Sequence, residues 1–122
     1  MRARAFCIIL ALAALTASPP VFGQYSECIG QEVKLQAYTE AGVVYVGVDK
    51  KSFNAIIGNL MAGDRANYLT LFFAHRGFEV SNFTKARILD VSFYEQAAQV
   101  QILEGPYEGR VGWVLIEHAL GY

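Results

Sequence analysis

A glycine-rich stretch near the end of the chain constrains the fold more than any other part of the sequence. Gly105 and Gly109 bracket a Pro-Tyr-Glu segment, and glycine can adopt the positive φ with which a chain reverses between two strands. Gly112 comes directly before Trp113, where the missing side chain permits another backbone or an aromatic ring to approach closely. The stretch therefore predicts two bent neighbouring strands joined by a tight loop.

Four short β-prone runs follow Gly77 and support this interpretation. They cover residues 78–80, 85–91, 98–103 and 111–116. In the last run Trp113 and Leu115 alternate with Val114 and Ile116, so the two pairs are expected to face opposite sides of a sheet. Strands that are apolar inside and partly covered outside predict a small barrel.

The segment before these runs predicts a hairpin followed by a helix. Residues 32–38 alternate polar and apolar side chains, and residues 43–48 are rich in β-branched ones, with turn-forming residues between them. Asp49 then offers an N-cap, apolar residues recur at helical spacing over residues 53–60, and Gly63 can end the helix in a left-handed conformation.

Residues 64–75 fit two interpretations. Asp64 can cap a second helix, whereas the aromatic run at 68–73 is also compatible with a strand, and we favour a helix that ends at Gly77. The expected fold class is thus mainly β with a minor α component: a small barrel with an N-terminal hairpin and one or two short helices.

The first 23 residues have the organisation of an export signal. Arg2 and Arg4 form a basic leader, an uncharged apolar run covers residues 5–17, and Ser-Pro-Pro interrupts any helix before Gly23. The run is shorter than the ~20 apolar residues that a spanning helix needs, which favours cleavage after Gly23 over anchoring in a membrane.

We therefore expect three segments along the chain. They are a signal peptide over 1–23, a hairpin–helix extension over 24–77 and a barrel over 78–122. Removal of the signal takes two of the ten basic side chains and none of the eleven acidic ones, which leaves a formal charge of −3. The basic residues are scattered apart from Lys50 and Lys51, so the basic patch of a nucleic-acid-binding protein is missing.

The glycine-rich stretch resembles the C-terminal half of bacterial SH3-like domains, in which a glycine-rich loop precedes Gly-Trp-Val and a short turn that carries Leu. The matching residues are Gly105, Tyr107, Gly109, Gly112, Trp113, Val114 and Leu120. Residues 84–90 are similar to the first barrel strand of the family, so the likeness extends from about Phe78 to Leu120. It implies an SH3-like barrel and a non-catalytic module of an exported or cell-envelope protein, of a kind often associated with peptide or cell-wall recognition.

Residues 100–114 also resemble the KOW motif of ribosomal and transcription-associated barrels. That resemblance would imply RNA or a cytoplasmic assembly as the partner. An exported and mildly acidic product fits neither partner, so we rank this interpretation below the envelope module.

Aromatic side chains in loops are the best candidates for a binding site. Phe93 and Tyr94 belong to one connection, Tyr107 and Arg110 belong to the glycine-rich loop, and loops carry recognition more often than strands do. We expect these four residues on the rim of a groove for an extended peptide or glycan. Trp113 is the fifth candidate, as a platform for a ligand, although a position in the barrel core is the favoured interpretation.

Catalysis and metal binding have little support in the sequence. After cleavage Cys28 is the single cysteine, and it is a candidate for an intermolecular disulfide, for a thiol nucleophile paired with His75 or His118, or for a small buried residue. These three side chains lack the spacing of metal ligands. We therefore predict a protein that is not an enzyme and that needs neither metal nor cofactor.

Three functions remain open at this point. The first is an exported binding module, periplasmic or secreted, that recognises a peptide or cell-wall component and has neither a nucleic-acid partner nor a membrane anchor. The alternative is a structural or assembly subunit that self-associates. The third and least supported is a small hydrolase that uses Cys28.

Overall fold

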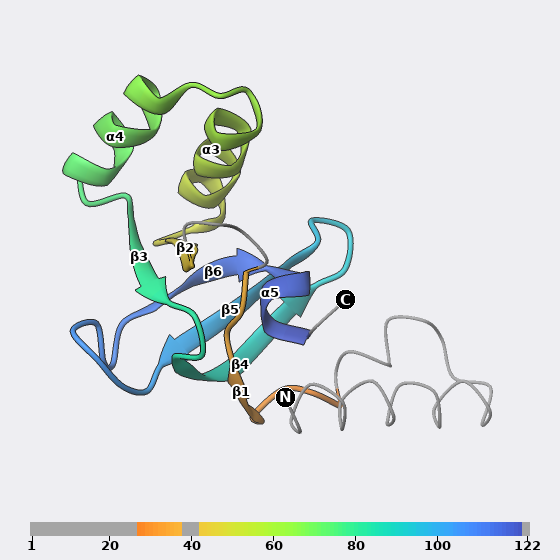
Figure 1. Ribbon diagram of the computed structural model, residues 1–122. Helices are drawn as coiled ribbons and strands as arrows, with labels where there is room; N and C mark the ends of the chain where they lie inside the picture. Colours follow the sequence, from red (N-terminus) through yellow and green to blue (C-terminus); the bar gives the residue numbers. More distant parts are fainter. Residues whose placement is uncertain (1–26, 38–41, 121–122) are drawn as a thin grey trace.

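An antiparallel sheet of six strands forms the body of the protein (Figure 1). The computed structural model describes residues 27–37 and 42–120, so the predicted signal peptide over 1–23 lies outside the described residues. The strands are β1 (Glu32–Lys34), β2 (Val43–Gly47), β3 (Gly77–Ser81), β4 (Lys85–Ser92), β5 (Ala97–Ile102) and β6 (Val111–Leu115). The helices are α3 (Lys50–Met61), α4 (Arg65–Phe73) and the short α5 (Ile116–Leu120). The predicted fold class, mainly β with a smaller helical part, is confirmed.

The strand order along the sheet is β1-β4-β5-β6-β2-β3, and it shows that the predicted hairpin over residues 32–48 is wrong. β1 pairs with β4, with Val33 opposite Ala86, and β2 pairs with β3, with Val44 opposite Val80. The alternating pattern of β1 and β2 suits any antiparallel partner, and the partners that complete the core lie far away in the sequence. Strands from both predicted segments, 24–77 and 78–122, consequently belong to one sheet.

Strands β4, β5 and β6 form an antiparallel meander, in which β5 and β6 are the two neighbouring strands that the glycine-rich stretch predicts. Gly105 and Gly109 in the β5–β6 loop have φ of +85° and +88°, the left-handed conformation that the sequence predicts for them. A side chain at Gly112 would collide with the Val46 side chain and lie 2.7 Å from the carbonyl oxygen of Gly47. Gly112 thus permits the close approach of β6 to β2.

The two ends of the strand order meet at the turn between β3 and β4. The N–H of Leu35 donates to Thr84 O at 2.9 Å, and the N–H of Phe83 donates to Leu35 O at 2.6 Å. The side-chain amide of Asn82 bonds to both the N–H and the C=O of Ala37, at 2.9 and 3.2 Å. The segment after β1 is therefore held to this turn, whereas among the described strands β3 itself pairs only with β2.

Apolar side chains form a separate cluster on each face of the sheet. The larger cluster includes Val114 and Ile116 together with residues of β1 to β6 and α5. On the opposite face Trp113 packs with Phe53 of α3 and with Ala97, and Leu115 lies against this second cluster. The predicted alternation in β6 is confirmed, and each large side chain that it buries contributes roughly 1.5–3 kcal/mol to stability.

Helix α3 begins and ends where the sequence predicts. The carboxylate of Asp49 accepts a hydrogen bond from the N–H of Ser52 at 2.7 Å, which caps the helix, and Gly63 has φ of +71° just after it. Phe53 and Ile56 point toward the sheet and are 2% exposed. Burial of this apolar stripe holds α3 against β2 and β6.

Residues 64–75 contain the helix α4, as favoured, but this helix does not extend to Gly77. Asp64 caps α4 by accepting from the N–H of Asn67 at 3.2 Å, and the helix ends at Phe73, with His75 in the left-handed region at φ of +59°. Gly77 instead begins β3, where a side chain would collide with Ile56 and lie 2.8 Å from Val46 O. Gly77 is therefore needed for packing between α3 and β3. The left-handed residue after the helix, which the sequence predicts at Gly77, is His75.

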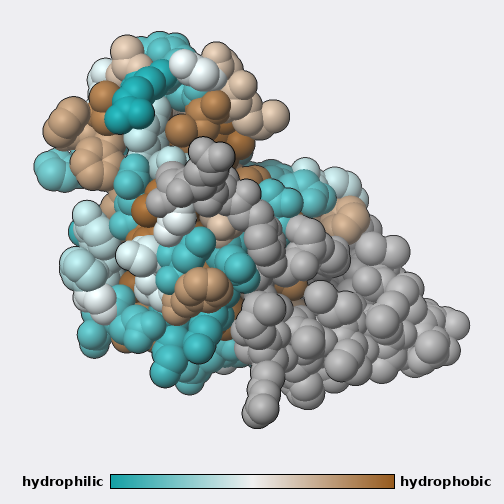
Figure 2. Space-filling model, viewed as in Figure 1, coloured by the Kyte–Doolittle hydropathy of each residue, from teal (hydrophilic) through white to brown (hydrophobic). Residues whose placement is uncertain are grey.

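Helices α3 and α4 stand together at one end of the sheet (Figure 1). Tyr68 is the buried residue of α4, and Met61 and Phe73 are 83% and 74% exposed. Figure 2 shows brown and tan atoms gathered on this helical lobe, whereas the surface of the sheet below it is mostly teal.

Candidate functional site

The five residues predicted to form a binding groove do not lie together. Phe93 and Tyr94 occupy the turn between β4 and β5, with ring centroids 5.9 Å apart, whereas Tyr107 and Arg110 lie in the loop between β5 and β6. β5 separates the two loops with six residues, about 20 Å at ~3.3 Å per residue. A single groove with all four residues on its rim is therefore wrong.

Trp113 lies in the core, as the favoured interpretation predicts. Its side chain packs beneath α3 and the residue is 7% exposed. The ammonium group of Lys50 lies 4.8 Å from the ring centroid, and the same ammonium pairs with Glu95 at 3.0 Å. The ring is thus covered and offers no platform to a ligand.

Tyr107 and Arg110 converge on one residue that the sequence did not single out, Phe78 of β3. The Tyr107 and Phe78 rings stack with centroids 4.6 Å apart and planes 24° apart. The guanidinium carbon of Arg110 lies 5.2 Å from the centroid of the Phe78 ring. Stacking and cation–π contact on the buried Phe78 ring hold the β5–β6 loop against β3.

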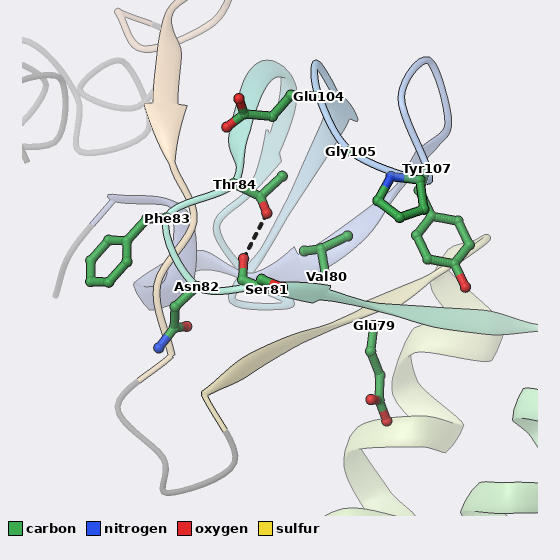
Figure 3. Close-up of a pocket in the computed structure, with 10 residues that line it drawn as sticks. Glu79, Val80, Ser81, Asn82, Phe83, Thr84, Glu104, Gly105 and Tyr107 are labelled. Atoms are coloured by element: carbon green, nitrogen blue, oxygen red, sulfur yellow. Dashed lines mark hydrogen bonds between the residues drawn. The ribbon is translucent and has the colours of Figure 1, made fainter.

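A cleft of about 340 Å³ opens between β3, the turn after it and the β5–β6 loop (Figure 3). Its lining comes from two stretches of the chain: the end of β3 with the β3–β4 turn, and the first part of the β5–β6 loop. The lining residues are Glu79, Val80, Ser81, Asn82, Phe83, Thr84, Glu104, Gly105, Pro106 and Tyr107. Figure 3 shows Val80 directed toward the loop, and Glu79 directed the other way, toward the helices.

β3 is an edge strand, and its ladder with β2 determines where its backbone groups point. At one end of the ladder the N–H of Val48 donates to Arg76 O at 3.1 Å, and at the other end the N–H of Asn82 donates to Gly42 O at 3.0 Å. Successive residues of an antiparallel strand direct their N–H and C=O groups alternately to one side and the other. The even-numbered residues of β3 therefore direct theirs toward β2.

The odd-numbered residues Gly77, Glu79 and Ser81 consequently direct their N–H and C=O groups to the outer side of the sheet. The carbonyl of Ser81 accepts from the N–H and the hydroxyl of Thr84, at 3.2 and 2.7 Å. Within residues 27–37 and 42–120 the N–H and C=O of Glu79 take part in no such bond. The cleft thus borders backbone groups that are available to a further strand.

Two carboxylates contribute to the lining of the cleft, and no lysine or arginine does so among the described residues. Glu104 accepts from the N–H of Lys85 at 3.0 Å, and Glu79 accepts from the hydroxyl of Tyr68 at 2.5 Å. Burial, followed by the hydrogen bond to Glu79, raises the pKa of Tyr68 far above its ordinary value of 10.0. Tyr68 therefore keeps its proton at neutral pH and remains a donor to the Glu79 carboxylate.

Cys28 lies in the larger core cluster and is 1% exposed. A disulfide to a second molecule, which the sequence left open, would require Cys28 to leave this core. His75 is exposed after α4, and His118 is largely buried on α5. In the part of the chain that the structure describes, no three His, Cys, Asp or Glu side chains are grouped so that they could hold a metal ion.

Comparisons with protein-family models, with curated proteins and with solved structures found no match to this chain. Among residues 27–37 and 42–120, no helix is both long and apolar enough to cross a bilayer.

Sequence reasoning found one side of the cleft and missed the other. The sequence identifies Tyr107 as a loop residue because glycine and proline mark its loop. The residues Phe78, Glu79 and Val80 look like an ordinary strand, and nothing in their composition shows that the strand lies at an edge. The polar Ser81-Asn82 pair after them signals only that the strand ends.

Proposed function

We propose that the chain is an exported, non-catalytic binding module, periplasmic or secreted, that holds an extended peptide along the outer edge of β3. The observation that carries this proposal is the position of the cleft, which borders the outward N–H and C=O groups of Glu79. Main-chain hydrogen bonds give a peptide affinity for such an edge, and pockets for alternate side chains add specificity.

Several features of the site favour a peptide over a compact small molecule. The volume of about 340 Å³ is near the lower end of ligand pockets, enough for a few side chains of a longer ligand. Val80, Pro106 and Tyr107 provide apolar surface beside the edge, and the stacked Phe78 and Tyr107 rings hold the loop in place before a ligand arrives. A site that needs little rearrangement loses less entropy when a peptide binds.

The resemblance to bacterial SH3-like domains supports the same class of function, because those domains are non-catalytic modules of exported and envelope proteins. The stretch that carries the resemblance, including Gly105 and Tyr107, contributes directly to the cleft. The export signal that the sequence predicts over residues 1–23 supports a location outside the cytoplasm.

Substitution of Ser81 by proline tests the proposal. The N–H of Ser81 points outward, so Ser81→Pro removes a group that a peptide would use and spares the ladder with β2. Ser81→Ala is the matched control, because it removes only the hydroxyl of an exposed side chain. The probe is a short peptide of alternating valine and threonine, titrated into the purified chain and followed by the shifts of backbone amide NMR signals.

We expect the largest shifts at Gly77, Glu79 and Ser81, with binding lost in Ser81→Pro and kept in Ser81→Ala. The strand-edge proposal fails if the peptide does not bind, or if Ser81→Pro binds it normally while folded. Sedimentation with purified peptidoglycan sacculi provides a second arm. Equal retention of the unmodified chain and Ser81→Pro on sacculi would mean that a cell-wall polymer is bound elsewhere, which also overturns the proposal.

A further inference from the structure

We propose that the β3 edge selects peptides with a basic residue between two apolar residues, the basic residue lying opposite Glu79. This inference rests on the proposed function and adds the chemistry of the preferred ligand. Its two supports are the alternation of side chains along an added strand and the Glu79 carboxylate, which forms no ion pair within residues 27–37 and 42–120.

Alternation places the side chains of a bound strand on two different surfaces. A peptide residue directly opposite Glu79 directs its side chain to the same face of the sheet as Glu79, toward the helices. Its two neighbours direct theirs to the other face, where Pro106 and Tyr107 of the β5–β6 loop line the cleft beside the largely buried Val80. The central position thus lies beside a carboxylate, and the flanking positions lie beside apolar and aromatic side chains.

The carboxylate of Glu79 is held in place, and it forms no ion pair with the described residues. One of its oxygens, Oε2, accepts the hydroxyl of Tyr68, while the Tyr68 ring packs edge-on against Tyr45 at 5.4 Å between centroids. Ion pairs within residues 27–37 and 42–120 join other side chains: Lys50 with Glu95, Arg76 with Asp49, and Arg87 with Glu32. His118 lies 3.8 Å from Glu117 and pairs with it when the imidazole is protonated. Glu79 belongs to none of these pairs, so a lysine or arginine of the peptide would supply its counter-charge.

The same carboxylate disfavours a second copy of this chain as the occupant. Glu79 is the central residue of β3, so a two-fold antiparallel pair of β3 strands centred on it would bring the two Glu79 carboxylates directly opposite each other. Like charges in that position destabilise strand pairing. A negatively charged residue in the middle of an edge strand is also a common protection against self-association. A basic peptide avoids this repulsion and replaces it with attraction.

Three peptides test the inference. They share the alternating valine and threonine sequence, and the central threonine is kept, replaced by lysine or replaced by glutamate. A cross-strand charge pair gives about 0.2–1 kcal/mol and the like-charge pair costs a similar amount, which together correspond to about two- to thirtyfold in the dissociation constant. We expect the lysine peptide to bind about sevenfold more tightly than the glutamate peptide, near the middle of that range. The measurement is the dissociation constant of each peptide from NMR or fluorescence titration.

Two matched variants locate the preference. Glu79→Gln removes the charge and keeps an oxygen for the Tyr68 hydroxyl, and we expect the ratio between the lysine and glutamate peptides to fall below about twofold. Glu104→Gln removes the other carboxylate of the lining, which lies in the loop, and we expect it to keep most of the preference. If both variants lose the preference equally, direct pairing of the peptide with Glu79 is refuted. The preference would then come from the combined negative electrostatic potential of the two carboxylates.

The outcomes separate this inference from the proposed function. If all three peptides bind equally and shift the amides of β3, the preference for a basic residue is refuted and strand addition stands. If none of them binds, both proposals fail. If the chain dimerises and Ser81→Pro is monomeric, a second copy occupies the edge and the inference is refuted.

Discussion

A single methyl group added at Gly47 is expected to push helix α3 away from the sheet. It ends β2, pairs with Trp113 of β6 and faces the first turn of α3. A Cβ atom built at Gly47 would lie 2.5 Å from Phe53 Cα and 2.6 Å from Phe53 N and Cβ. Ordinary contact distances are 3.4–4 Å, and the obstructing atoms are mostly helix backbone that cannot rotate away. Gly47→Ala therefore requires α3 to move by roughly 1 Å, given how tightly protein interiors are packed.

The cost follows from what that movement disturbs. α3 covers Trp113 and Ala97 with Phe53, and overpacking of such an interface costs about 1–3 kcal/mol. For a domain of this size we expect the melting temperature to fall by about 5–20 °C. Gly58→Ala is the matched control: Gly58 lies inside α3 with no atom within 4 Å of a built Cβ. The same chemical change there is expected to stabilise the protein by about 0.5–1 kcal/mol, because alanine forms helix better than glycine.

Urea denaturation measures both variants. Circular dichroism follows the whole fold, and the fluorescence of Trp113, the single tryptophan of the chain, follows the contact between α3 and the sheet. We expect opposite signs for the changes in unfolding free energy of Gly47→Ala and Gly58→Ala. A Gly47→Ala protein within about 0.5 kcal/mol of the unmodified chain would refute the close packing of α3 on β2, since surface substitutions stay within that range.

Two further variants test the cap of α3 and the loop of the cleft. Hydrogen bonds from Ser52, followed by the charge of Arg76, lower the pKa of Asp49 below its ordinary 3.8. The ionised carboxylate therefore stabilises the fold above about pH 4, and this stabilisation is lost as the pH falls through the lowered pKa. We expect Asp49→Asn to be less stable at neutral pH and to show a flatter decline in acid-range thermal melts; an unchanged decline would contradict this. Tyr107→Ala removes the stacked ring from Phe78, and we expect it to cost about 0.5–1.5 kcal/mol beyond lost burial and to weaken peptide binding. Full peptide affinity in a folded Tyr107→Ala protein would remove the β5–β6 loop from the site.

The sequence predicts those parts of this fold that depend on neighbouring residues. Asp49 caps α3 through a hydrogen bond to a residue three positions away, and Gly105 adopts positive φ in a tight loop between two strands. The opposite faces of Trp113 and Val114 follow from the alternation of any strand. In each case the deciding interaction is local, or the rule holds whatever the partner is.

The predictions that were wrong concern contacts between residues far apart in the chain. β1 and β2 are close in sequence and each has a suitable pattern, but β1 pairs with β4 while β2 pairs with β3 and β6. The groove of four loop residues failed for a related reason, because Phe93 and Tyr107 lie in successive turns and therefore at opposite ends of β5. Residue types suggested recognition, and the topology decided which of them could meet.

The cleft shows how one choice of register controls both stability and the chemistry of the site. The groups offered by the β3 edge are amide N–H and C=O groups, which almost every residue carries, so no residue type marks them in the sequence. They are available because the ladder assigns the groups of Phe78 and Val80 to β2 and leaves those of Glu79 outside. A slip of one residue would move Glu79 to the core face and Val80 to the solvent face. The burial of Phe78 and Val80 therefore opposes the slip, and the same burial keeps the Glu79 carboxylate beside the edge at which a peptide would bind.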